Sequence, residues 1–370
     1  MNIQSVQIDI VDLPTIRPHQ LSMHTITMQT IVVAQVRDTE GLVGWSEVAT
    51  IGGASYGEST PEAIKANAEV YIVPHLIGKD PKQFNRIMHD VSKFVSGNTF
   101  AKALIEGALI DLAAKQRQLP AYDLLGGKIH DALPIAWTLA SGDTGSDIEE
   151  AKELLHQKRH NIFKLKIGVG DAMKNVEHVL KIKEAVGDQA RLTVDVNQAW
   201  DERTAYYAIE ALQDGGVSMI EQPLPKWDFE GMQRLTERFH VSIMADEGAN
   251  DAHEIFQIAK HRAGSSIALK ICKAGGLLAT KEVASIARAA GLELYGGTMI
   301  ESSLGSAIGL HVYATLPELQ FGTELFGPLL FQDTLTTNDI EYRDFQVHIP
   351  EGIGFGMTID EEKLKHYKRQ

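Results

Sequence analysis

Cysteine is almost absent from this sequence of 370 residues, which contains only Cys272. A single cysteine excludes a disulfide within the chain and is typical of proteins from a reducing compartment. No activating motif surrounds Cys272, so we interpret it as a small buried hydrophobic residue rather than a catalytic thiol. The N-terminal stretch carries Asp9 and Asp12 among its apolar residues, unlike a secretory signal peptide. These features predict a cytoplasmic protein.

Positive charge is also scarce, because 35 lysine and arginine residues stand against 49 acidic ones and the formal net charge is −14. Nucleic-acid binding needs clustered basic residues that neutralise phosphates, so the composition argues against such a partner. No apolar run approaches the length of about 18 residues that a membrane span requires. An anionic substrate would need a locally positive pocket inside this acidic shell.

A G-x-G-x-x-G motif after a predicted strand is missing too, which argues against a doubly wound dinucleotide-binding sheet. Aromatic residues make up 7% and apolar residues 44% of the chain, as is typical of an α/β protein. The length exceeds the size at which a single hydrophobic core stops growing, so we expect more than one structural unit.

The two ends of the chain predict an α+β unit over residues 1–128 and a returning segment over residues 331–370. The returning segment is strand-like at residues 342–349 and is expected to pack on the first unit. In the first unit, strand patterns lie at residues 6–11, 30–37 and 42–48, with a turn at residues 38–41. Helical patterns follow at residues 61–73 and 102–118.

Between these segments, residues 129–330 alternate short apolar strands with amphipathic helices, a pattern that predicts a closed α/β barrel. The helix at residues 251–260 is expected to turn Ile255, Phe256 and Ala259 inward. Eight strands are predicted, at residues 134–139, 162–167, 191–196, 218–220, 242–245, 266–271, 293–295 and 320–323.

Single charged residues interrupt the ends of these apolar strands. Asp195, Glu221, Asp246 and Lys270 follow one another at intervals of 26, 25 and 24 residues. Each interval is close to one strand-plus-helix repeat, so these residues should lie at the same height on successive strands. The C-terminal ends of barrel strands are where catalytic groups from different strands converge.

The strand at residues 162–167 carries two lysines, Lys164 and Lys166. Side chains alternate along a strand, so both lysines point to one face while Phe163 and Leu165 point to the other. If the apolar face packs on the helices, both ammonium groups lie inside the barrel, where charge is costly without carboxylates, a metal or a ligand nearby. The alternative is an edge strand with a solvated lysine face.

Asp195, Glu221 and Asp246 form a set of three carboxylates at strand ends. Three carboxylates aimed at one point repel one another and raise one another's pKa values. A hard divalent cation removes this conflict, and oxygen-only ligands favour Mg²⁺ or Mn²⁺. Each carboxylate could instead cap the next helix, but their equal spacing favours a shared metal site.

Lys270 lies on the strand after the third carboxylate, around the barrel from the first two lysines. A buried lysine near a cation is expected to have a lowered pKa, which suits it for proton transfer near neutral pH. A lysine that extends from a strand end into solvent is the alternative. Lys273 is the rival candidate, in the turn before Gly275-Gly276, and Glu324 follows the eighth predicted strand.

These residues resemble the enolase superfamily and, within it, the muconate lactonising subgroup. That subgroup carries a K-x-K strand, here Lys164-Leu165-Lys166, then carboxylate ligands on three successive strands and a lysine on the next. The resemblance covers the whole chain and implies a modified (β/α)8 barrel of the (β/α)7β type with an α+β N-terminal capping domain. Longer strings that match the cycloisomerases of the subgroup begin at Thr50, Asn98, Trp137 and Gly322 and read TIGG, NTFAK, WTLASGDT and GTELFGP.

The resemblance implies an isomerase of aromatic catabolism that interconverts cis,cis-muconate and muconolactone through an enolate. Mn²⁺ or Mg²⁺ held by Asp195, Glu221 and Asp246 would stabilise that enolate. By the same carry-over, Lys166 delivers or removes the proton at the α-carbon and Lys164 neutralises charge. The substrate is then a small dicarboxylate, and relatives of this kind form homo-oligomers, often octamers.

Other expected roles rest on the same resemblance. Lys270 supplies electrostatic help or acts as the alternative acid or base, and Glu324 contacts the substrate. Asn197 shares strand parity with Asp195 and is expected to support it from behind.

The capping domain should close over the barrel mouth with residues 51–57 and residues 19–24. Ile51 and Tyr56 are candidate contacts for substrate specificity. Two segments depart from the subgroup: Glu247-Gly248-Ala249 stands where Glu-Ser is common, and residues 298–303 carry serines where cycloisomerases often have glycines.

Several related activities would use the same metal and lysines. They are those of chloromuconate cycloisomerase, o-succinylbenzoate synthase and dipeptide or N-acylamino-acid epimerase. A barrel that binds an anion without chemistry is the alternative from a different class of protein.

Overall fold

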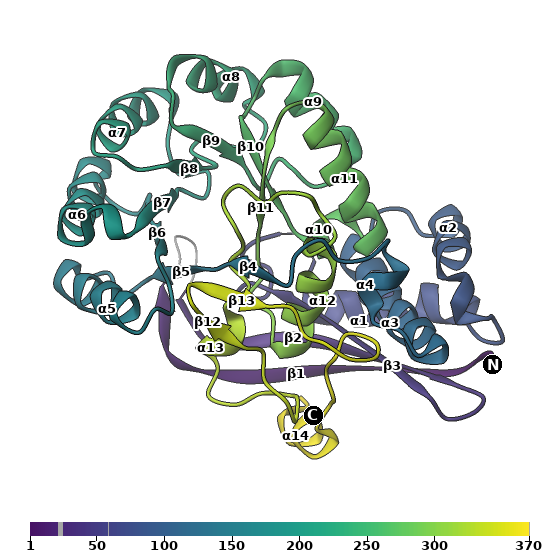
Figure 1. Cartoon of the computed structure of the whole chain (residues 1–370). Coiled ribbons are helices and arrows are strands. Elements are labelled where there is room, and N and C mark those ends of the chain that lie inside the picture. Colours follow the sequence, from purple (N-terminus) through teal and green to yellow (C-terminus); the bar gives the residue numbers. More distant parts are fainter. Residues whose placement is uncertain (21–24, 58, 370) are drawn as a thin grey trace.

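The computed structural model describes residues 1–20, 25–57 and 59–369. Figure 1 shows a ring of short strands surrounded by helices, with a second unit of long strands and helices packed against it. The predicted fold class, an α/β barrel with an α+β capping unit, is confirmed. Among the described residues, no helix combines the length and the apolar character needed to cross a membrane.

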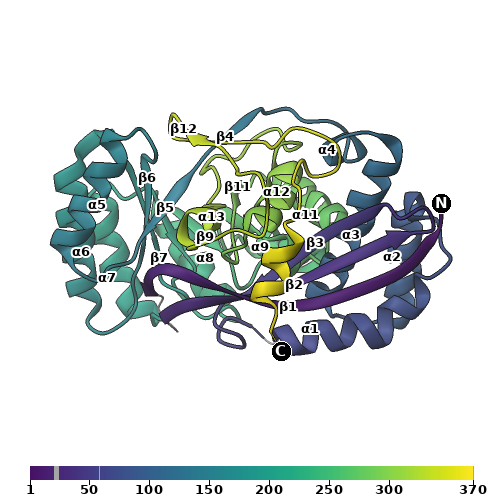
Figure 2. The ribbon, with the colours of Figure 1, turned by 90° about the horizontal axis from the view of Figure 1, so that it is seen from below.

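The capping unit is built on an antiparallel sheet in the order β1-β2-β3. The turn at residues 38–41 is confirmed, because the Gly41 amide donates to the Asp38 carbonyl at 3.1 Å. The long strands cross the lower part of the view in Figure 2, on the side of the barrel that the capping unit covers. The strands are β1 (Ile3–Gln20), β2 (Thr25–Asp38) and β3 (Val43–Thr50).

The helix predicted at residues 61–73 is interrupted. It begins as α1 (Pro61–Asn67), widens into the π-helical turn η1 (Ala68–Ile72) and tightens into the 3-10 turn η2 (Val73–His75). Pro74 explains the change, because proline has no amide hydrogen to donate and its ring crowds the preceding turn.

Among the remaining helices of the capping unit, α2 and the short helices η3 and α4 were not predicted. The predicted helix at residues 102–118 is present as α3, whose Leu104, Ala108 and Leu112 are fully buried. These helices are η3 (Pro81–Gln83), α2 (Phe84–Phe94), α3 (Thr99–Arg117) and α4 (Ala121–Leu124).

The barrel contains seven parallel strands in the unbroken order β5 to β11. Its outer helices follow the strands one by one around the ring in Figure 1. The strands are β5 (Ala136–Leu139), β6 (Ile162–Lys166), β7 (Arg191–Asp195), β8 (Met219–Glu221), β9 (Ser242–Ala245), β10 (Ser266–Leu269) and β11 (Glu293–Gly296).

The eighth strand predicted at residues 320–323 is reduced to a bridge at one residue. Thr323 forms parallel bridges with both Ile135 and Gly296, on the two edges of the seven-stranded sheet. The Thr323 amide donates to the Pro134 carbonyl at 2.9 Å, and the Glu324 amide donates to the Gly296 carbonyl at 2.9 Å. These backbone bonds close the ring and fix Glu324 at its inner end.

Most of the outer helices of the barrel bury one apolar face, as amphipathic helices do, whereas α12 is buried at every residue. The prediction that Phe256 turns inward is wrong, because its side chain is 57% exposed while Ile255 and Ile258 are buried. Spacing by three residues selects Ile255 and Ile258, and Phe256 lies about 100° away around the helix. The helices are α5 (Thr144–His156), α6 (Ala172–Val186), α7 (Glu202–Asp214), α8 (Phe229–Arg238), α9 (Ala252–His261), α10 (Ile271–Ala274), α11 (Leu277–Ala289) and α12 (Ser303–Tyr313).

The last part of the chain returns to the capping unit. Arg369 forms ion pairs with Asp12 and Glu62 at 2.7 and 2.5 Å. Boundaries between domains at residues 128 and 330 stay a prediction. The returning elements are α13 (Gly327–Leu330), β12 (Tyr342–Arg343), β13 (Gln346–His348) and α14 (Glu361–Tyr367). Strand β13 pairs with β4 (Ala132–Pro134), which precedes the barrel. The barrel also contains the 3-10 turn η4 (Gly187–Gln189), between α6 and β7.

Buried carboxylates fasten the capping unit to the barrel. Glu106, on α3, accepts hydrogen bonds from the backbone amides of Leu277 and Leu278 and so caps the first turn of α11. Gly276 precedes that turn without a side chain, and a Cβ there would lie 2.1 Å from the Glu106 carboxylate. Glu47, on β3, accepts in the same way from the Ser302 amide at 2.7 Å.

Burial raises the pKa of Glu106 to about 7, although its amide donors oppose the shift. A group whose pKa is raised on folding contributes stability at low pH, and this contribution is lost as pH rises from about 4.5 through about 7. The unsubstituted protein should lose about 2 kcal/mol of unfolding free energy between pH 5.5 and pH 8 from this group, and Glu106→Gln should not. The stability of Glu106→Gln relative to the unsubstituted protein therefore rises by that amount over this pH range. Urea unfolding at both pH values measures this, with the exposed Glu177→Gln as control. A pH-independent difference would contradict the assignment.

Candidate active site

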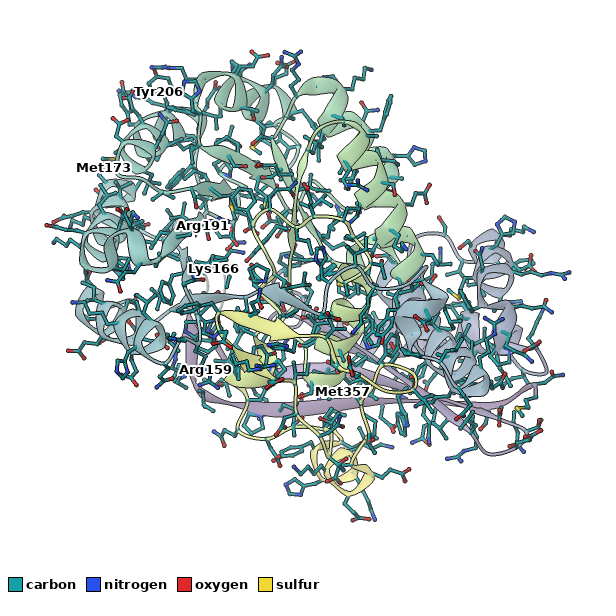
Figure 3. All side chains as sticks on the ribbon, viewed as in Figure 1. Arg159, Lys166, Met173, Arg191, Tyr206 and Met357 are labelled. Carbon is teal, nitrogen blue, oxygen red and sulfur yellow. The ribbon has the colours of Figure 1, made fainter. Side chains whose placement is uncertain are left out.

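The strand register brings the predicted residues to one level of the barrel. Lys166 on β6 is paired with Asp195 on β7, and Asp195 is paired with Glu221 on β8. Asp246 lies just beyond the end of β9, and Lys270 directly follows β10. Figure 3 shows Lys166 on the inner side of the ring, whereas Met173 and Tyr206 lie on the outer helices. The strand-end residues therefore converge on the interior, as their equal spacing predicted.

An apolar layer forms the floor beneath this level. It consists of five buried residues that point into the barrel: Met219, Met244, Ala268, Tyr295 and Phe321. Tyr295 also reaches upward, because its hydroxyl donates to Glu324 Oε2 at 2.5 Å. The floor separates the charged layer from the opposite end of the barrel.

Lys164 lies at the centre of one half of the charged layer and is 1% exposed. Its Nζ lies 2.6 Å from Glu221 Oε2 and 3.7 Å from Asp195 Oδ2, and it donates to Glu324. Burial favours the neutral amine, but Glu221 and Glu324 outweigh burial and raise the pKa of Lys164 well above its ordinary value. The charged form of Lys164 is therefore favoured, and both lysines face the interior rather than solvent.

Lys166 is paired with Asp195 through a hydrogen bond to Oδ2. Asp195 is fully buried, which on its own would raise its pKa, but Lys166 and Lys164 outweigh burial and lower it. Unlike Lys164, Lys166 retains some exposure, 13% of its side chain. It is thus the ammonium group of this pair that a substrate can reach more easily.

The other half of the layer is organised around Asp246. Lys270 Nζ lies 2.8 Å from Oδ2 of Asp246, and Lys273 Nζ lies 2.6 Å from Oδ1. Lys273 also donates to the Asp246 backbone carbonyl at 2.6 Å. The sequence analysis treated these lysines as rivals, but both hold Asp246, and Lys273 lies in the short helix α10 rather than in a turn.

Carboxylates determine the pKa of Lys270 in this arrangement. Burial alone would lower the pKa, but the carboxylates of Asp246 and Glu221 outweigh burial and raise it. The same pairing, with Lys273, lowers the pKa of Asp246. A lowered pKa of Lys270 beside a bound cation stays a prediction.

Glu221 is the carboxylate of the site whose negative charge is least well compensated. Burial, followed by the neighbouring charge of Asp195, raises its pKa to about 8 even though Lys164 is close. Its Oε2 atom lies 2.6 Å from the ammonium of Lys164 without hydrogen-bond geometry, and it has no other hydrogen-bond partner among the described residues. A further cation beside Glu221 would relieve this conflict.

The donor set fits a hard divalent cation. Asp195, Glu221 and Asp246 are all 1% exposed or less, they offer only oxygen ligands, and Glu221 Oε2 accepts no hydrogen bond. Within residues 1–20, 25–57 and 59–369, no group of three His, Cys, Asp or Glu side chains is already drawn together as a metal cage. The lysine ammonium groups instead lie between the carboxylates.

Asn197 and Glu247 border the carboxylates. The Asn197 amide nitrogen donates to Asp195 Oδ1 at 2.9 Å, and its side-chain Nδ2 lies 3.3 Å from Asp195 Oδ2 and 3.2 Å from Glu247 Oε1. The sequence analysis named Asn197 but noted Glu247 only as part of a departing segment. Burial and the charge of Asp246 raise the pKa of Glu247 to about 7. Its position next to Asp246 was the available signal.

Two loop residues of the capping unit reach the site. Ile51 is 6% exposed, and the Tyr56 hydroxyl donates to Asp246 Oδ2 at 2.9 Å and accepts from Lys270 Nζ at 2.8 Å. The ring of Tyr56 also lies 4.3 Å from that ammonium group. Of the segment at residues 19–24 that was expected to close over the barrel, residues 21–24 lie outside the described residues.

These groups surround a cavity between the strand ends and the capping unit. Thr138 and Phe326 of its wall were not predicted as site residues, whereas Thr298 and Ile300 belong to the segment at residues 298–303 that the sequence had already singled out. The complete lining is His19, Ile51, Tyr56, Thr138, Lys164, Lys166, Asn197, Glu221, Lys270, Thr298, Ile300, Glu324 and Phe326.

Two family models match the chain. Residues 5–126 match the mandelate racemase / muconate lactonizing enzyme N-terminal domain, and residues 146–363 match the enolase C-terminal domain-like model. The chain belongs to the mandelate racemase / muconate lactonizing enzyme family. The resemblance based on the K-x-K strand and the spaced carboxylates is thereby confirmed at the level of the family.

Members of the family with similar sequences span the whole chain. Muconate cycloisomerase 1 of Acinetobacter baylyi is 45% identical over 99% of both chains, and that of Pseudomonas putida is 47% identical over 97% of this chain and 96% of the relative. A chloromuconate cycloisomerase of Delftia acidovorans is 45% identical over 100% of both chains. Muconate lactonizing enzyme from Pseudomonas fluorescens, solved with muconolactone, superposes with a TM-score of 0.98 at 46% identity, covering 100% of this chain and 99% of that chain.

For this member of the family, Lys164→Met should expose the cost of an unpaired buried charge. The substitution removes the cation that neutralises Glu221 and Glu324, so we expect a loss of about 3 kcal/mol of unfolding free energy at pH 8. The loss should shrink at pH 5.5, where the carboxylates bind protons. Urea unfolding at both pH values, with Lys181→Met on the exposed face of α6 as control, measures this. Equal losses for the two variants would refute the pairing.

Proposed function

We propose that this chain is a cycloisomerase that interconverts cis,cis-muconate and muconolactone. The observation that carries the proposal is the convergence of three buried carboxylates between two groups of lysines at the C-terminal ends of the strands. Its relatives named muconate cycloisomerase are 45–47% identical over nearly the full length. The reaction belongs to the catabolism of aromatic compounds.

The chemistry moves negative charge from one end of the substrate to the other. In the lactonising direction, an oxygen of one carboxylate bonds to a carbon of the conjugated diene, and the π electrons shift to the carbon beside the other carboxylate. The resulting enolate is then protonated on that carbon. The dianionic substrate takes up one proton and becomes a monoanionic lactone, so the site must stabilise charge at one end only.

Enzymes of this family depend on a divalent metal ion, and we propose Mn²⁺ or Mg²⁺ here. Asp195, Glu221 and Asp246 would hold the ion, because they are buried oxygen ligands whose mutual repulsion a cation relieves. When bound, the ion supplies electrostatic stabilisation of the enolate oxygens.

Lysines carry out the proton transfer on this proposal. Lys166, the more exposed of the β6 pair, delivers the proton to the α-carbon and removes it in reverse. Lys164 stays protonated between Glu221 and Glu324 and neutralises charge from below. Lys270 stabilises the enolate from the opposite side or acts as the alternative acid or base.

Other residues hold this machinery in place and contact the substrate. Asn197 fixes the orientation of Asp195 through its hydrogen bonds. Glu324 lies against the substrate at the inner wall of the cavity. Ile51 and Tyr56 contact the substrate from the capping loop and contribute to specificity. Closure of this loop excludes water, which strengthens the electrostatic stabilisation.

Chlorinated muconates are the nearest alternative substrates, because chloromuconate cycloisomerases are 44–45% identical to this chain. The specificity contacts proposed above would decide between them. We further propose that the protein is cytoplasmic and forms a homo-oligomer, most simply an octamer as in relatives. Light scattering at several concentrations tests the oligomer, and a concentration-independent monomer mass would exclude it.

The assay that tests the function follows the ultraviolet absorbance of cis,cis-muconate. We expect absorbance to fall on addition of the protein, to stop falling after treatment with a chelator, and to fall again after added Mn²⁺. Because the ion relieves repulsion between buried carboxylates, the chelator should also lower the melting temperature by several degrees. Unchanged absorbance with the metal-loaded protein would exclude the proposed substrate, and an unchanged melting temperature would exclude the metal site.

Lys166→Ala tests the assignment of the proton donor. We expect turnover to fall by at least about 100-fold, the usual contribution of a positioned general acid or base. The melting temperature should also fall, because buried Asp195 loses the ammonium group it is paired with, so turnover is compared at a temperature at which the variant is folded. Lys181→Ala, on the outer face of α6, is the control and should keep full activity. Residual turnover within threefold of the unsubstituted protein would rule out Lys166 as the donor.

A further inference from the structure

His19 has an unusual position among the polar residues of the cavity. It lies near the end of β1, where it is paired with Ile26 of β2, and its side chain is only 1% exposed. Its ring lies 6.2 Å from that of Phe326, and both residues line the cavity. The Nδ1 atom of His19 is buried and has no hydrogen-bond partner among the described residues. A buried polar atom without a partner is costly unless a ligand supplies one.

The other capping residues of the cavity cannot offer a free polar group. Three of them form the lining on that side: His19, Ile51 and Tyr56. Ile51 is apolar, and the Tyr56 hydroxyl is already engaged with Asp246 and Lys270. His19 is therefore the residue through which the capping unit can form a hydrogen bond to a polar end of the substrate.

The imidazole of His19 is neutral. Burial, together with the nearby cations Arg17 and Lys166, lowers its pKa to about 3. A neutral ring can still donate a hydrogen bond through Nδ1 in the tautomer that carries the proton there. It does so without adding a positive charge to that end of the cavity.

We propose that His19 binds the attacking carboxylate of the substrate through a neutral hydrogen bond from Nδ1. This inference rests on the proposed function and adds a residue and a charge distribution to it. The attacking carboxylate loses its negative charge when its oxygen becomes part of the lactone. An interaction that is stronger in the ground state than in the transition state slows the chemical step. A neutral donor orients the attacking carboxylate. It stabilises the negative charge of that carboxylate in the ground state less than an ammonium group would, so less stabilisation is lost when the lactone forms.

The ammonium groups of the site are already engaged. Lys164, Lys166 and Lys270 are all paired with the strand-end carboxylates near which the enolate charge develops. The site thus offers ammonium groups to the enolate, and His19 adds a neutral donor for the attacking carboxylate although Lys166 is near. This division matches the movement of charge in the proposed reaction.

Three substitutions of His19 test the inference with the metal-loaded, full-length protein. His19→Phe keeps a ring and removes the donor, and we expect kcat/KM for cis,cis-muconate to fall about 10- to 100-fold. His19→Asn places an amide nitrogen where Nδ1 lies, and we expect it to recover most of that loss. His19→Lys adds a cation, and we expect both KM and kcat to fall, because the substrate is stabilised more than its transition state.

His160 provides a matched control. It is also fully buried, its Nε2 has no partner among the described residues, and burial lowers its pKa to about 4, but it packs on Trp137 away from the cavity lining. His160→Phe should leave KM unchanged. Melting temperatures of all variants separate loss of folding from loss of binding.

The outcomes are distinguishable from those of the proposed function. If the unsubstituted protein fails to consume cis,cis-muconate, the proposed function itself fails. If it turns over and His19→Phe keeps kcat and KM within threefold, the inference about His19 is overturned. Should His19→Phe not fold, a His19→Lys variant with unchanged or raised KM overturns it equally, and a fall in both constants supports it.

Discussion

Opposite charges buried side by side are the constraint on which this molecule depends. Neither the carboxylates nor the ammonium groups at the strand ends could be taken out of water alone, because an unpaired buried charge costs several kcal/mol. Each member of the set makes the burial of its neighbours tolerable: Lys164 with Glu221, Lys166 with Asp195, and two lysines with Asp246. The pairing is incomplete at Glu221, which is the electrostatic opening that a divalent cation fits.

The barrel supplies the geometry that such a charged layer needs. Its parallel register aligns Lys166, Asp195 and Glu221 across three adjacent strands, so converging side chains follow from backbone hydrogen bonds rather than from flexible loops. The apolar floor below and the capping loop above keep water away from the layer. In a dry cavity the electrostatic interactions are stronger than in water.

Much of this arrangement could be predicted because it is periodic. The repeat of strand and helix fixes the intervals between Asp195, Glu221 and Asp246, and alternation along β6 places Lys164 and Lys166 on one face. Local turns were predictable for the same reason, since the turn before Gly41 is encoded within four residues. Periodicity within a segment does not predict contacts between the capping unit and the barrel. The hydrogen bond from the Tyr56 hydroxyl to Asp246 and the nitrogen of His19 without a partner are therefore evident only in the structure.

Other errors have specific physical causes. The sequence suggested Phe256 for the buried face of α9 because it is large and apolar, but the helical angle selects Ile258. Pro74 turned a predicted helix into a widened and then a tightened turn. The eighth strand is held through backbone hydrogen bonds at Thr323, and the side-chain pattern of residues 320–323 does not reveal how short that strand is.

The attachment of the capping unit has a consequence for how this protein can change over generations. Glu106 binds the barrel through the main-chain amides of Leu277 and Leu278, whereas Glu47 binds both the amide and the hydroxyl of Ser302. Every amino acid except proline offers a main-chain amide, so Leu277 and Leu278 can be exchanged for other residues without losing the hydrogen bonds to Glu106. Variation can therefore accumulate at these two positions while the two units stay assembled, whereas Ser302 is held to a residue with a hydroxyl group.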